Sequence, residues 1–419
     1  MNVHVTKTIP IEFKWVVDAY QKVRQGGKAA GIDGESWTDF DKKAEQHCYL
    51  IWNRLSSGSY HPQAVRRVEI PKKDGTLRKL GIPTLKDRIA QQVVKDYMEK
   101  RIDEKFHKDS YGYRPKKSAH AALKAIQKNC QELDWVIDMD ISKFFDEIDH
   151  ELMLKAVSHI LPDTSWVNLY VKRWLEMPVV EPTGETVEHQ GKGTPQGGVI
   201  SPILANLYLH YTLDLWLNKH YPSIRFVRYA DDVVIHCRRE EEAKRLLESI
   251  RERLSEAKLS IKESKTKIAY CKDYRRRLEY EHVKFEFLGF SFQPVTLKSM
   301  YKEGTYYIGF GGKPSSGNEQ RITQIIKDSK LFSNTTISLK SIADKLNEKL
   351  QGWINYYCLF TKHGLNKVWY ILECRILKWI GKKYKTGIYK SLAKLKGIKQ
   401  STPKLFYHWE LGIRRSYQK

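Results

Sequence analysis

The chain has 419 residues, and 73 Lys and Arg against 49 Asp and Glu leave a formal net charge of +24. This length allows about two or three domains, and so large an excess of positive charge favours a polyanionic partner such as nucleic acid. No apolar run reaches the roughly 18 residues of a membrane span, and the N-terminus has no secretory signal. The six cysteines are scattered without zinc spacing, which predicts a reduced, cytosolic protein.

The first part of the chain is predicted to combine helices with one pair of strands. Residues 1–59 are predicted to be helical around a Gly-rich break, QGGKAAGIDG. AVRRVEIPKKDGTLRKLGIP then predicts two strands that flank a turn at 73–75. Thr84 followed by Asp87 resembles a capping box, which predicts a helix over 85–102.

The middle of the chain predicts a second group of strands and helices. DWVIDMDIS predicts a buried strand, and Asp149 predicts an N-cap for the helix that follows. Ser201 before Pro202 predicts another N-cap, for the helix ILANLYLHYTLDLWL. FVRYADDVVIHC predicts a hairpin, which an amphipathic helix and the strand LSIKESKTKIAY follow. This order of strand, helix, helix, hairpin, helix and strand predicts a split βαβ sheet of the ferredoxin-like kind.

The last third of the chain differs in texture and in charge. A loop-rich stretch is expected after about Gln293, with a domain boundary, and the chain is predicted to be helical from about Arg321. Between Tyr301 and Lys419, 23 basic residues stand against 7 acidic ones, so +16 of the net charge of +24 lies there. This region is therefore expected to contact nucleic acid.

Two adjacent carboxylates, Asp231 and Asp232, interrupt the apolar hairpin. A turn explains them without any function, because Asp is common in turns. A metal site is the alternative, and it needs a third carboxylate. Asp138 and Asp140 alternate on one face of the predicted buried strand, where a carboxylate is costly unless it is paired or binds a metal. Two-metal phosphoryl transfer needs carboxylates from separate strands, so Asp140 beside Asp231 would suit it, with one residue of the Asp pair peripheral.

A Gly-rich stretch, GKGTPQGGVISP at 191–202, leads into a predicted helix. Glycines and a helix start let backbone N–H groups, and a side chain such as Gln196, approach a nucleotide closely. Taken alone, such a stretch is more often structural than functional.

Several sequence blocks occur in a characteristic order. DISKFFD, GTPQGGVISPILANLYL, RYADD, the KT of LSIKESKTKI and FEFLGF follow the order of reverse-transcriptase motifs A to E. RRVEIPKKDGTLRKLGIP and SYGYRPKKSAHAAL upstream, with LQGWINYY downstream, narrow the likeness. From about residue 20 to its end, the chain resembles the bacterial group II intron-encoded reverse transcriptase/maturase family.

The resemblance implies a metal site. Asp140 and Asp231 match the ligands of two Mg²⁺ ions, for which Mn²⁺ is a substitute, and Asp232 has a supporting role. The backbone carbonyl of Ile141 is implied as a further ligand.

The resemblance also implies which residues bind the nucleotide. Lys72 and Arg78 match a basic pair that grips the triphosphate, and Gln196 is expected to bind the nucleotide from below. Lys265 matches a lysine proposed as an acid for the pyrophosphate. Phe145 matches a bulky residue against the sugar, where a ring collides with a 2′-OH and selects deoxynucleotides.

Two residues are expected to contact the primer and the template, Arg114 and Tyr229. Trp353, Tyr356 and Tyr357 are expected to lie in the core of the C-terminal region rather than to stack on RNA.

The resemblance implies an α+β fold, a right-hand polymerase whose fingers and palm contain the ferredoxin-like sheet, followed by a helical thumb or maturase region. The expected parts are an N-terminal helical extension at 1–59, fingers and palm at 60–295, a thumb and maturase domain at 296–385, and a basic segment at 386–419. Many family members end in a Cys/His-rich endonuclease module, and no such cluster precedes Lys419.

The expected function is RNA-directed DNA synthesis, together with binding and assisted splicing of a structured intron RNA. The expected partners are that RNA, an RNA template with a DNA or RNA primer, dNTPs and target DNA, with no membrane, in the bacterial cytosol or nucleoid. Two alternatives stay open. One is a host-adopted reverse transcriptase, for example in phage defence, and the other is an RNA-binding splicing factor without polymerase activity.

Overall fold

The computed structural model of the chain describes residues 9–71, 75, 77–188, 190–298 and 304–411. The chain forms two compact units: unit 1 comprises Met1–Ala122 and Ile137–Lys267, and unit 2 comprises Leu123–Val136 and Ile268–Lys419. Among the described residues, no helix has both the length and the apolar character needed to cross a bilayer.

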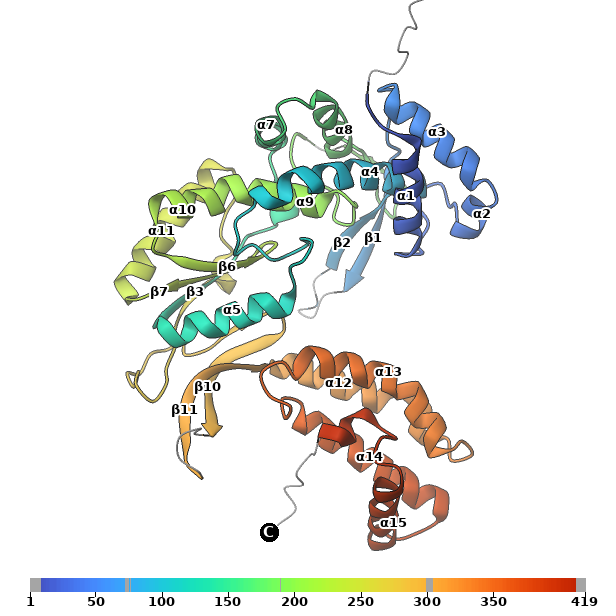
Figure 1. The fold of residues 1–419 in the computed structure, drawn as a ribbon, viewed down its shortest axis with the longest axis vertical. Helices are drawn as coiled ribbons and strands as arrows, with labels where there is room; N and C mark the ends of the chain where they lie inside the picture. Colours follow the sequence, from blue (N-terminus) through green and yellow to red (C-terminus); the bar gives the residue numbers. More distant parts are fainter. Residues whose placement is uncertain (1–8, 72–74, 76, 189, 299–303, 412–419) are drawn as a thin grey trace, which may run out of the picture. The chain divides into compact units, whose positions relative to one another are not determined.

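Unit 1 begins with helices, as expected from the sequence. These are α1 (Phe13–Arg24), α2 (Trp37–Asp41) and α3 (Ala44–Ser56), drawn in blue in Figure 1. They pack together, and α1 also packs on α4 (Leu85–Ile102), the helix predicted from its capping box. The hydroxyl of Thr84 accepts a hydrogen bond from the Asp87 backbone N–H at 3.1 Å and donates to the Asp87 carboxylate at 2.7 Å. The predicted cap is therefore confirmed.

A small sheet carries the basic hairpin that the sequence predicted. β1 (Val65–Pro71) pairs antiparallel with β2 (Leu77–Ile82), and the sheet order is β2-β1-β4-β5. The two short strands are β4 (Val179–Val180) and β5 (Thr186–Val187). Most of the turn expected at 73–75 lies outside the described residues.

A second sheet carries the acidic motifs, in the order β6-β7-β3-β8. Its strands are β3 (Trp135–Asp140), β6 (Arg225–Tyr229), β7 (Asp232–Cys237) and β8 (Lys267–Tyr270). This order is the ferredoxin-like one, because the first strand in sequence lies between the second strand of the hairpin and the last strand. The expected mixed α+β polymerase fold is confirmed.

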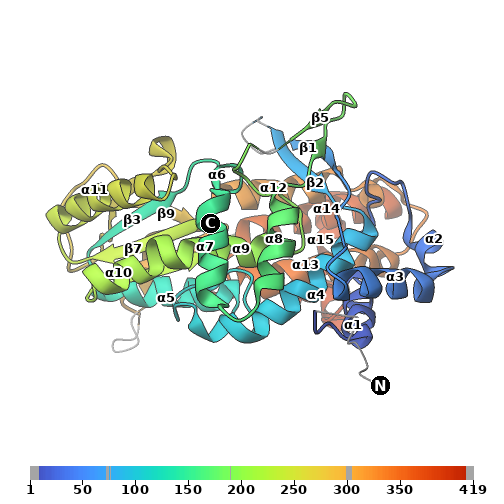
Figure 2. The same ribbon diagram turned by 90° about the horizontal axis from the view of Figure 1, so that it is seen from above.

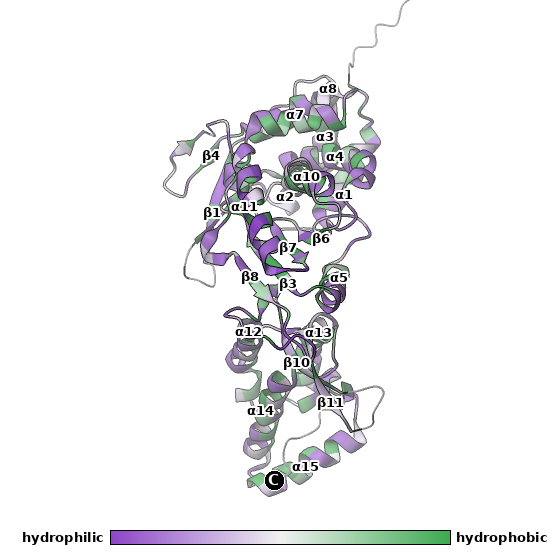
Figure 3. Cartoon of the chain, turned by 90° about the vertical axis from the view of Figure 1, so that its left-hand side faces the viewer, coloured by the Kyte–Doolittle hydropathy of each residue, from purple (hydrophilic) through white to green (hydrophobic). Residues whose placement is uncertain are grey.

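Helices precede and connect the strands of this second sheet. They are α5 (Ala119–Glu132), α6 (Phe144–Glu147), α7 (His150–Ile160), α8 (Ser165–Leu175), α9 (Ser201–Leu209), α10 (Leu215–His220) and α11 (Glu240–Glu256), with short helical turns η1 (Asp103–Lys105), η2 (His210–Asp214) and η3 (Glu263–Lys265). Figure 2 shows α7 and α8 lying side by side, and Figure 3 shows hydrophilic and hydrophobic residues alternating along α7. The Asp149 cap of α7 is confirmed, since its carboxylate accepts from the Leu152 N–H at 2.9 Å.

Two local predictions, one for the start of α9 and one for the strand that ends in β8, are wrong. Ser201 is the first residue of α9 rather than its N-cap, which is Ile200. The Ser201 hydroxyl instead donates to the Pro195 carbonyl at 3.0 Å, so it holds the Gly-rich loop in place. The strand expected over 259–270 forms only at its end, in β8, because the turn η3 interrupts it.

Unit 2 contains an antiparallel sheet followed by helices. The sheet has the order β11-β10-β9, from β9 (Phe285–Phe287), β10 (Phe290–Lys298) and β11 (Tyr306–Pro314). The loop-rich stretch expected after Gln293 is therefore wrong. Its glycines pair across a regular hairpin, where Val295 faces Gly309 and Gln293 faces Gly311. Composition favoured loops there, but the ladder of cross-strand hydrogen bonds forms a sheet.

The helical C-terminal region expected from the sequence is confirmed. Its elements are α12 (Ser316–Asp328), η4 (Lys330–Ser333), α13 (Leu339–Tyr357), α14 (Asn366–Tyr384), α15 (Ile388–Ser401) and η5 (Tyr407–Leu411). Tyr357 is buried, and the Tyr356 hydroxyl donates to the Leu288 carbonyl at 2.9 Å, so both residues lie in the core as predicted. Trp353 is half-buried.

Candidate active site

The two adjacent carboxylates lie at the tip of the β6–β7 hairpin. Tyr229 pairs with Asp232 across the strands, so Ala230 and Asp231 form the turn between them. Ala230 has a left-handed backbone with φ of 57°. A non-glycine residue in this conformation costs free energy, and it persists only where its surroundings hold it.

A third carboxylate, Asp140, ends β3, the strand next to β7 in the sheet. Burial raises the pKa of Asp231, and the negative charge of Asp140 raises it further, while Arg78 opposes the shift. Burial, followed by the charges of Asp231 and Asp140, raises the pKa of Asp232 to about 7. Asp232 is nevertheless solvent-exposed, so we attribute its raised pKa mainly to the charges of the two nearby carboxylates. The adjacent strands β3 and β7 thus place Asp140 close to the hairpin turn, as a charge that acts on both Asp231 and Asp232.

The donor set suits a hard divalent cation. Carboxylate oxygens are the ligands that Mg²⁺ prefers. Carboxylates that lie close together repel one another, and a bound cation relieves that repulsion. Lys265 places a positive charge beside this site, with its ammonium 3.3 Å from the Asp140 carboxylate. No three His, Cys, Asp or Glu side chains within the described residues converge closely enough to form a metal site by themselves. A cation there would therefore need further ligands from water, backbone or substrate, and the Ile141 carbonyl is next along the chain.

The residues predicted to bind the nucleotide lie around this hairpin. The Arg78 guanidinium donates from Nε to the Gln196 side-chain carbonyl at 3.2 Å, and the Gln196 backbone carbonyl accepts from the Gly81 N–H at 2.7 Å. Arg78 is exposed, and its charge acts on Asp231. Lys72 lies outside the described residues.

The Gly-rich loop approaches β2 more closely than a side chain would allow. Gly197 has φ of 120°, and a Cβ atom on it would lie 2.5 Å from the Gly81 carbonyl oxygen. Glycine is therefore required at this position, and the approach holds Gln196 beside Arg78.

Two consecutive phenylalanines in α6 have different surroundings. Phe144 is buried, with 2% of its surface exposed, whereas Phe145 is only half-buried. The Phe145 carbonyl accepts from the Thr194 N–H at 2.7 Å, which ties α6 to the Gly-rich loop. Phe144 thus fills the core, and the Phe145 ring is left partly accessible near the loop that carries Gln196.

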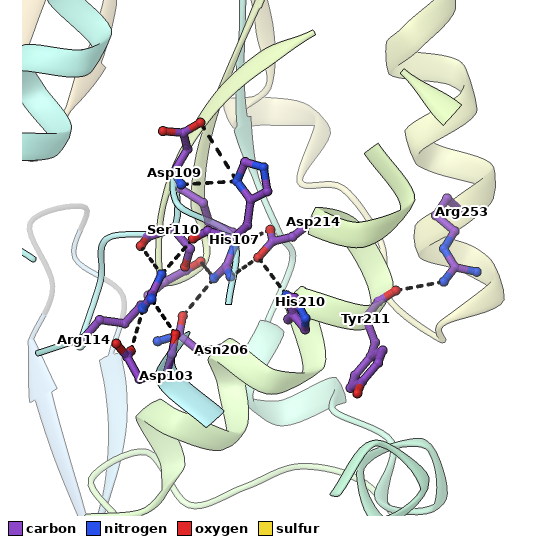
Figure 4. Close-up of polar contacts among 12 residues, drawn as sticks. Asp103, His107, Asp109, Ser110, Arg114, Asn206, His210, Tyr211, Asp214 and Arg253 are labelled. Carbon is purple, nitrogen blue, oxygen red and sulfur yellow. Dashed lines mark hydrogen bonds and ion pairs between the residues drawn. The ribbon is translucent and has the colours of Figure 1, made fainter. Parts of the chain in front are cut away.

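The two residues predicted to contact the primer and template differ in accessibility. Tyr229 is half-buried, and its ring lies 6.2 Å from that of the exposed Tyr113. The Arg114 side chain is only 6% exposed and donates to Asp103 at 2.7 Å and to the Ser110 carbonyl at 2.9 Å (Figure 4). These bonds give Arg114 a structural part in the loop 103–114, and its contact with nucleic acid stays a prediction.

Sequence reasoning gave no role to a buried ion pair behind the hairpin. Arg228 and Asp214 are both fully buried and pair at 2.5 Å. A signal existed for each of them, since Arg228 follows the apolar pair Phe226 and Val227 in β6, and Asp214 lies in the largely apolar run YTLDLWL. Only the fold shows that they meet.

Comparisons with known proteins agree with this site. The family described as "Reverse transcriptase (RNA-dependent DNA polymerase)" matches residues 70–292, and the "Group II intron, maturase-specific domain" matches residues 319–396. The first match contains the whole acidic hairpin and Gly-rich loop, and the second covers most of the C-terminal helices.

Related proteins are found in bacteria and in yeast. "Protein YkfC" of Escherichia coli is 31% identical over 62% of this chain and 78% of its own length. "Group II intron-encoded protein LtrA" of Lactococcus lactis is 26% identical over 90% of this chain and 74% of its own length. "Putative COX1/OXI3 intron 1 protein" of Saccharomyces cerevisiae is 30% identical over 40% of this chain. An RNA-directed DNA polymerase and an intron maturase region are thus joined in one chain, which belongs to the group II intron-encoded reverse transcriptase/maturase family.

Proposed function

We propose that this reverse transcriptase extends a DNA or RNA primer on an RNA template from dNTPs, with Asp140 and Asp231 as the ligands of divalent ions. Reverse transcriptases generally use such ions. The observation that carries the proposal is that Asp140 ends β3, the strand next to β7, and that its charge helps to raise the pKa of Asp231 in the turn before β7. Asp232 and the Ile141 carbonyl are the further ligands. When bound, two Mg²⁺ ions, or Mn²⁺ as a substitute, activate the attacking oxygen and stabilise the leaving one.

The chain's own residues bind and orient the nucleotide. Arg78, with Lys72, neutralises the triphosphate, and Gln196 holds the nucleotide against the Gly-rich loop. The accessible ring of Phe145 lies against the sugar and excludes a 2′-OH. Lys265, whose ammonium lies 3.3 Å from Asp140, supplies a proton to the leaving pyrophosphate.

The template strand and the primer are held beside the turn. Tyr229, with the exposed Tyr113 beside it, offers ring surface for stacking. Arg114 contributes by holding the loop 103–114 in its conformation, through hydrogen bonds to Asp103 and Ser110.

The second part of the function is the binding of intron RNA by the C-terminal helices. The maturase match over 319–396 favours this function over a host-adopted reverse transcriptase. Exposed basic residues on α14, α15 and the turn between them support it, namely Lys382, Lys385, Lys390, Lys394 and Lys396. Target DNA is the further partner in intron mobility, and the bacterial cytosol and nucleoid are the proposed location.

The division into an extension at 1–59, fingers and palm at 60–295, a thumb and maturase domain at 296–385 and a basic segment at 386–419 is also a proposal. Helices α1 to α3, the family match over 70–292 and the helices after β11 support it. Helix α14 packs on α15, so we propose that the boundary at 385/386 separates two functions within one folding unit.

Primer extension on an RNA template tests the proposed chemistry. DNA synthesis should stop when a chelator removes divalent ions and should return on addition of Mg²⁺ or Mn²⁺. Binding of the RNA should change little, because phosphate contacts with Lys and Arg supply it. Synthesis that continues in the presence of excess chelator would contradict the proposal.

A further inference from the structure

The turn that carries Asp231 is attached to a completely buried arginine. Arg228, in β6, is 0% exposed. Its guanidinium donates to the Asp214 carboxylate at 2.8 and 2.5 Å and to the Asn206 side-chain carbonyl at 2.9 Å. It also donates to the backbone carbonyl of Ala230 at 3.1 Å. One side chain therefore links the left-handed residue of the turn to the helical segment behind it.

Asp214 reaches this position from a π-helical segment, His210–Asp214. Such a segment inserts one residue into a helix, and it often occurs at functional sites. The neighbouring His210 lies 3.9 Å from Asp214, but burial lowers its pKa, so it is neutral near pH 7. Arg228 is therefore the lasting cationic partner of Asp214. Figure 4 shows the contact between Asp214 and His210.

A second segment holds the turn from the other side. The Arg228 N–H donates to the Asp109 carbonyl at 3.0 Å, and the Arg228 carbonyl accepts from the Tyr111 N–H at 2.8 Å. The Asn206 amide donates to the Gly112 carbonyl at 2.8 Å. A Cβ atom on Gly112 would lie 2.5 Å from the Ala230 nitrogen, so the loop and the turn are in direct contact.

We infer that Arg228 and Asp214 are positioning residues for the polymerase reaction. They hold the Ala230 carbonyl and, through it, the direction of Asp231. A buried ion pair gives little net stability compared with apolar residues of similar size, so a role in geometry explains its presence better than a role in stability. The inference rests on the proposed function, because it concerns the residue proposed there as a metal ligand.

The test compares Arg228→Lys and Asp214→Asn with a matched control elsewhere in the chain. Arg276 and Asp273, in unit 2, also form a buried pair at 2.6 Å, so Arg276→Lys changes a similar pair outside unit 1, which carries the turn. A loss of about tenfold to a hundredfold in kcat is expected for the first two variants, since small misplacements near a reacting centre have effects of that size. KM for dNTP should change less than about threefold, and the Mg²⁺ concentration for half-maximal rate should rise.

A structural measurement without metal completes the test. Backbone amides at 226–234 should exchange hydrogen faster in Arg228→Lys and Asp214→Asn than in the wild type, whereas Arg276→Lys should leave that segment unchanged. Wild-type kcat and Mg²⁺ dependence in a folded Arg228→Lys or Asp214→Asn would overturn the inference.

The variants that break the pair leave one buried charge unpaired, which destabilises the fold. The double variant Arg228→Met with Asp214→Leu removes both charges and should fold, with the same loss of kcat. Failure of all three to fold would make the pair a folding requirement and would also overturn the inference. A wild-type protein that makes no DNA would instead contradict the proposed function.

Discussion

Phe145 is proposed to set the choice of sugar, because its ring is half-buried while Phe144 fills the core. Phe145→Ala should raise the incorporation of ribonucleotides relative to deoxynucleotides by about tenfold or more, since it removes a steric clash with the 2′-OH. Single-turnover kcat/KM values for a dNTP and its rNTP measure this preference. Phe145→Tyr keeps the ring and serves as the control. An unchanged preference in the Ala variant would leave Phe145 as an ordinary core residue.

Arg78 and Gln196 are expected to act on the same nucleotide, because they share a hydrogen bond of 3.2 Å. Each Ala substitution should raise KM for dNTP by about tenfold with a smaller change in kcat, as for the loss of a binding contact. The double variant should lose less than the sum of the single losses, because each single change also breaks the bond between the two residues. Strictly additive effects in steady-state kinetics would contradict a joint site.

At the scale of elements, η5 is attached to α14 through one carboxylate. Glu373 accepts from Lys399 at 2.5 Å, from His408 at 3.0 Å and from Trp409 at 2.5 Å. Burial alone would raise the pKa of Glu373, but the bonds from His408 and Lys399 outweigh it and lower the pKa to about 2. Glu373 thus joins η5 to α14, while Asn347 of α13 also holds the segment by donating to the Leu405 carbonyl at 3.0 Å and accepting from the Tyr407 N–H at 3.3 Å.

Glu373→Gln should lower the free energy of unfolding by about 1–3 kcal/mol, because it leaves buried donors poorly paired. The folded pKa of about 2 lies below the unfolded value of about 4.3, so the wild-type contribution is complete above pH 4.3 and is lost as the pH falls towards 2. Denaturant unfolding at several pH values should show this loss in the wild type and less of it in Glu373→Gln. Glu348→Gln, on the exposed face of α13, should match the wild type, and equal acid sensitivity in Glu373→Gln would contradict the account.

Helix α15 is the element proposed to bind intron RNA. Removing residues from Gly381 onward is an unsuitable test of RNA binding, because it would cut α14. It would also remove His408, which is bonded to Glu373. The structure offers surface substitutions instead. Ala at the exposed lysines should weaken binding to a long structured RNA and flatten its salt dependence, because each phosphate contact releases about one counterion. The residues are Lys390, Lys394 and Lys396, all in α15.

The control for α15 is an Ala triple at exposed lysines of unit 1, namely Lys14, Lys43 and Lys219. Filter binding of structured RNA at several salt concentrations, and extension on a short pre-annealed primer-template, should separate the two triples. Equal losses of both activities in the α15 triple would make α15 part of the polymerase clamp rather than a surface for intron RNA.

For the whole molecule, local signals in the sequence predicted the elements well. The Thr84 cap, the Asp149 cap and the alternation through β6 and β7 depend on neighbours a few residues away, so the sequence contains them directly. The hairpin of β10 and β11 was missed because its glycines resemble those of a loop, and only the cross-strand pairing of the two strands distinguishes a hairpin from a loop.

The residues of the candidate site also differ in whether the sequence predicted them. Residue types and predicted strand positions singled out Asp140 and Asp231, the Gly-rich loop singled out Gln196, and the resemblance then implied their roles. The pair of Arg228 and Asp214 was not predicted, since the π-helical segment that brings Asp214 inward has no clear sequence signature. Positioning residues depend on packing between elements, and one sequence does not show that packing.

Single-turnover primer extension on an RNA template by Asp140→Asn and Asp138→Asn tests the central claim most directly. Both residues lie in β3, and the Asp138 carboxylate lies 3.8 Å from the Lys267 ammonium rather than belonging to the proposed ligand set. Asp140→Asn should lower the rate by about a thousandfold or more, since a lost metal ligand removes several kcal/mol of transition-state stabilisation, while RNA affinity stays within about threefold. Asp138→Asn should stay within about tenfold of the wild type. Extension by Asp140→Asn at a rate near the wild type would contradict the account.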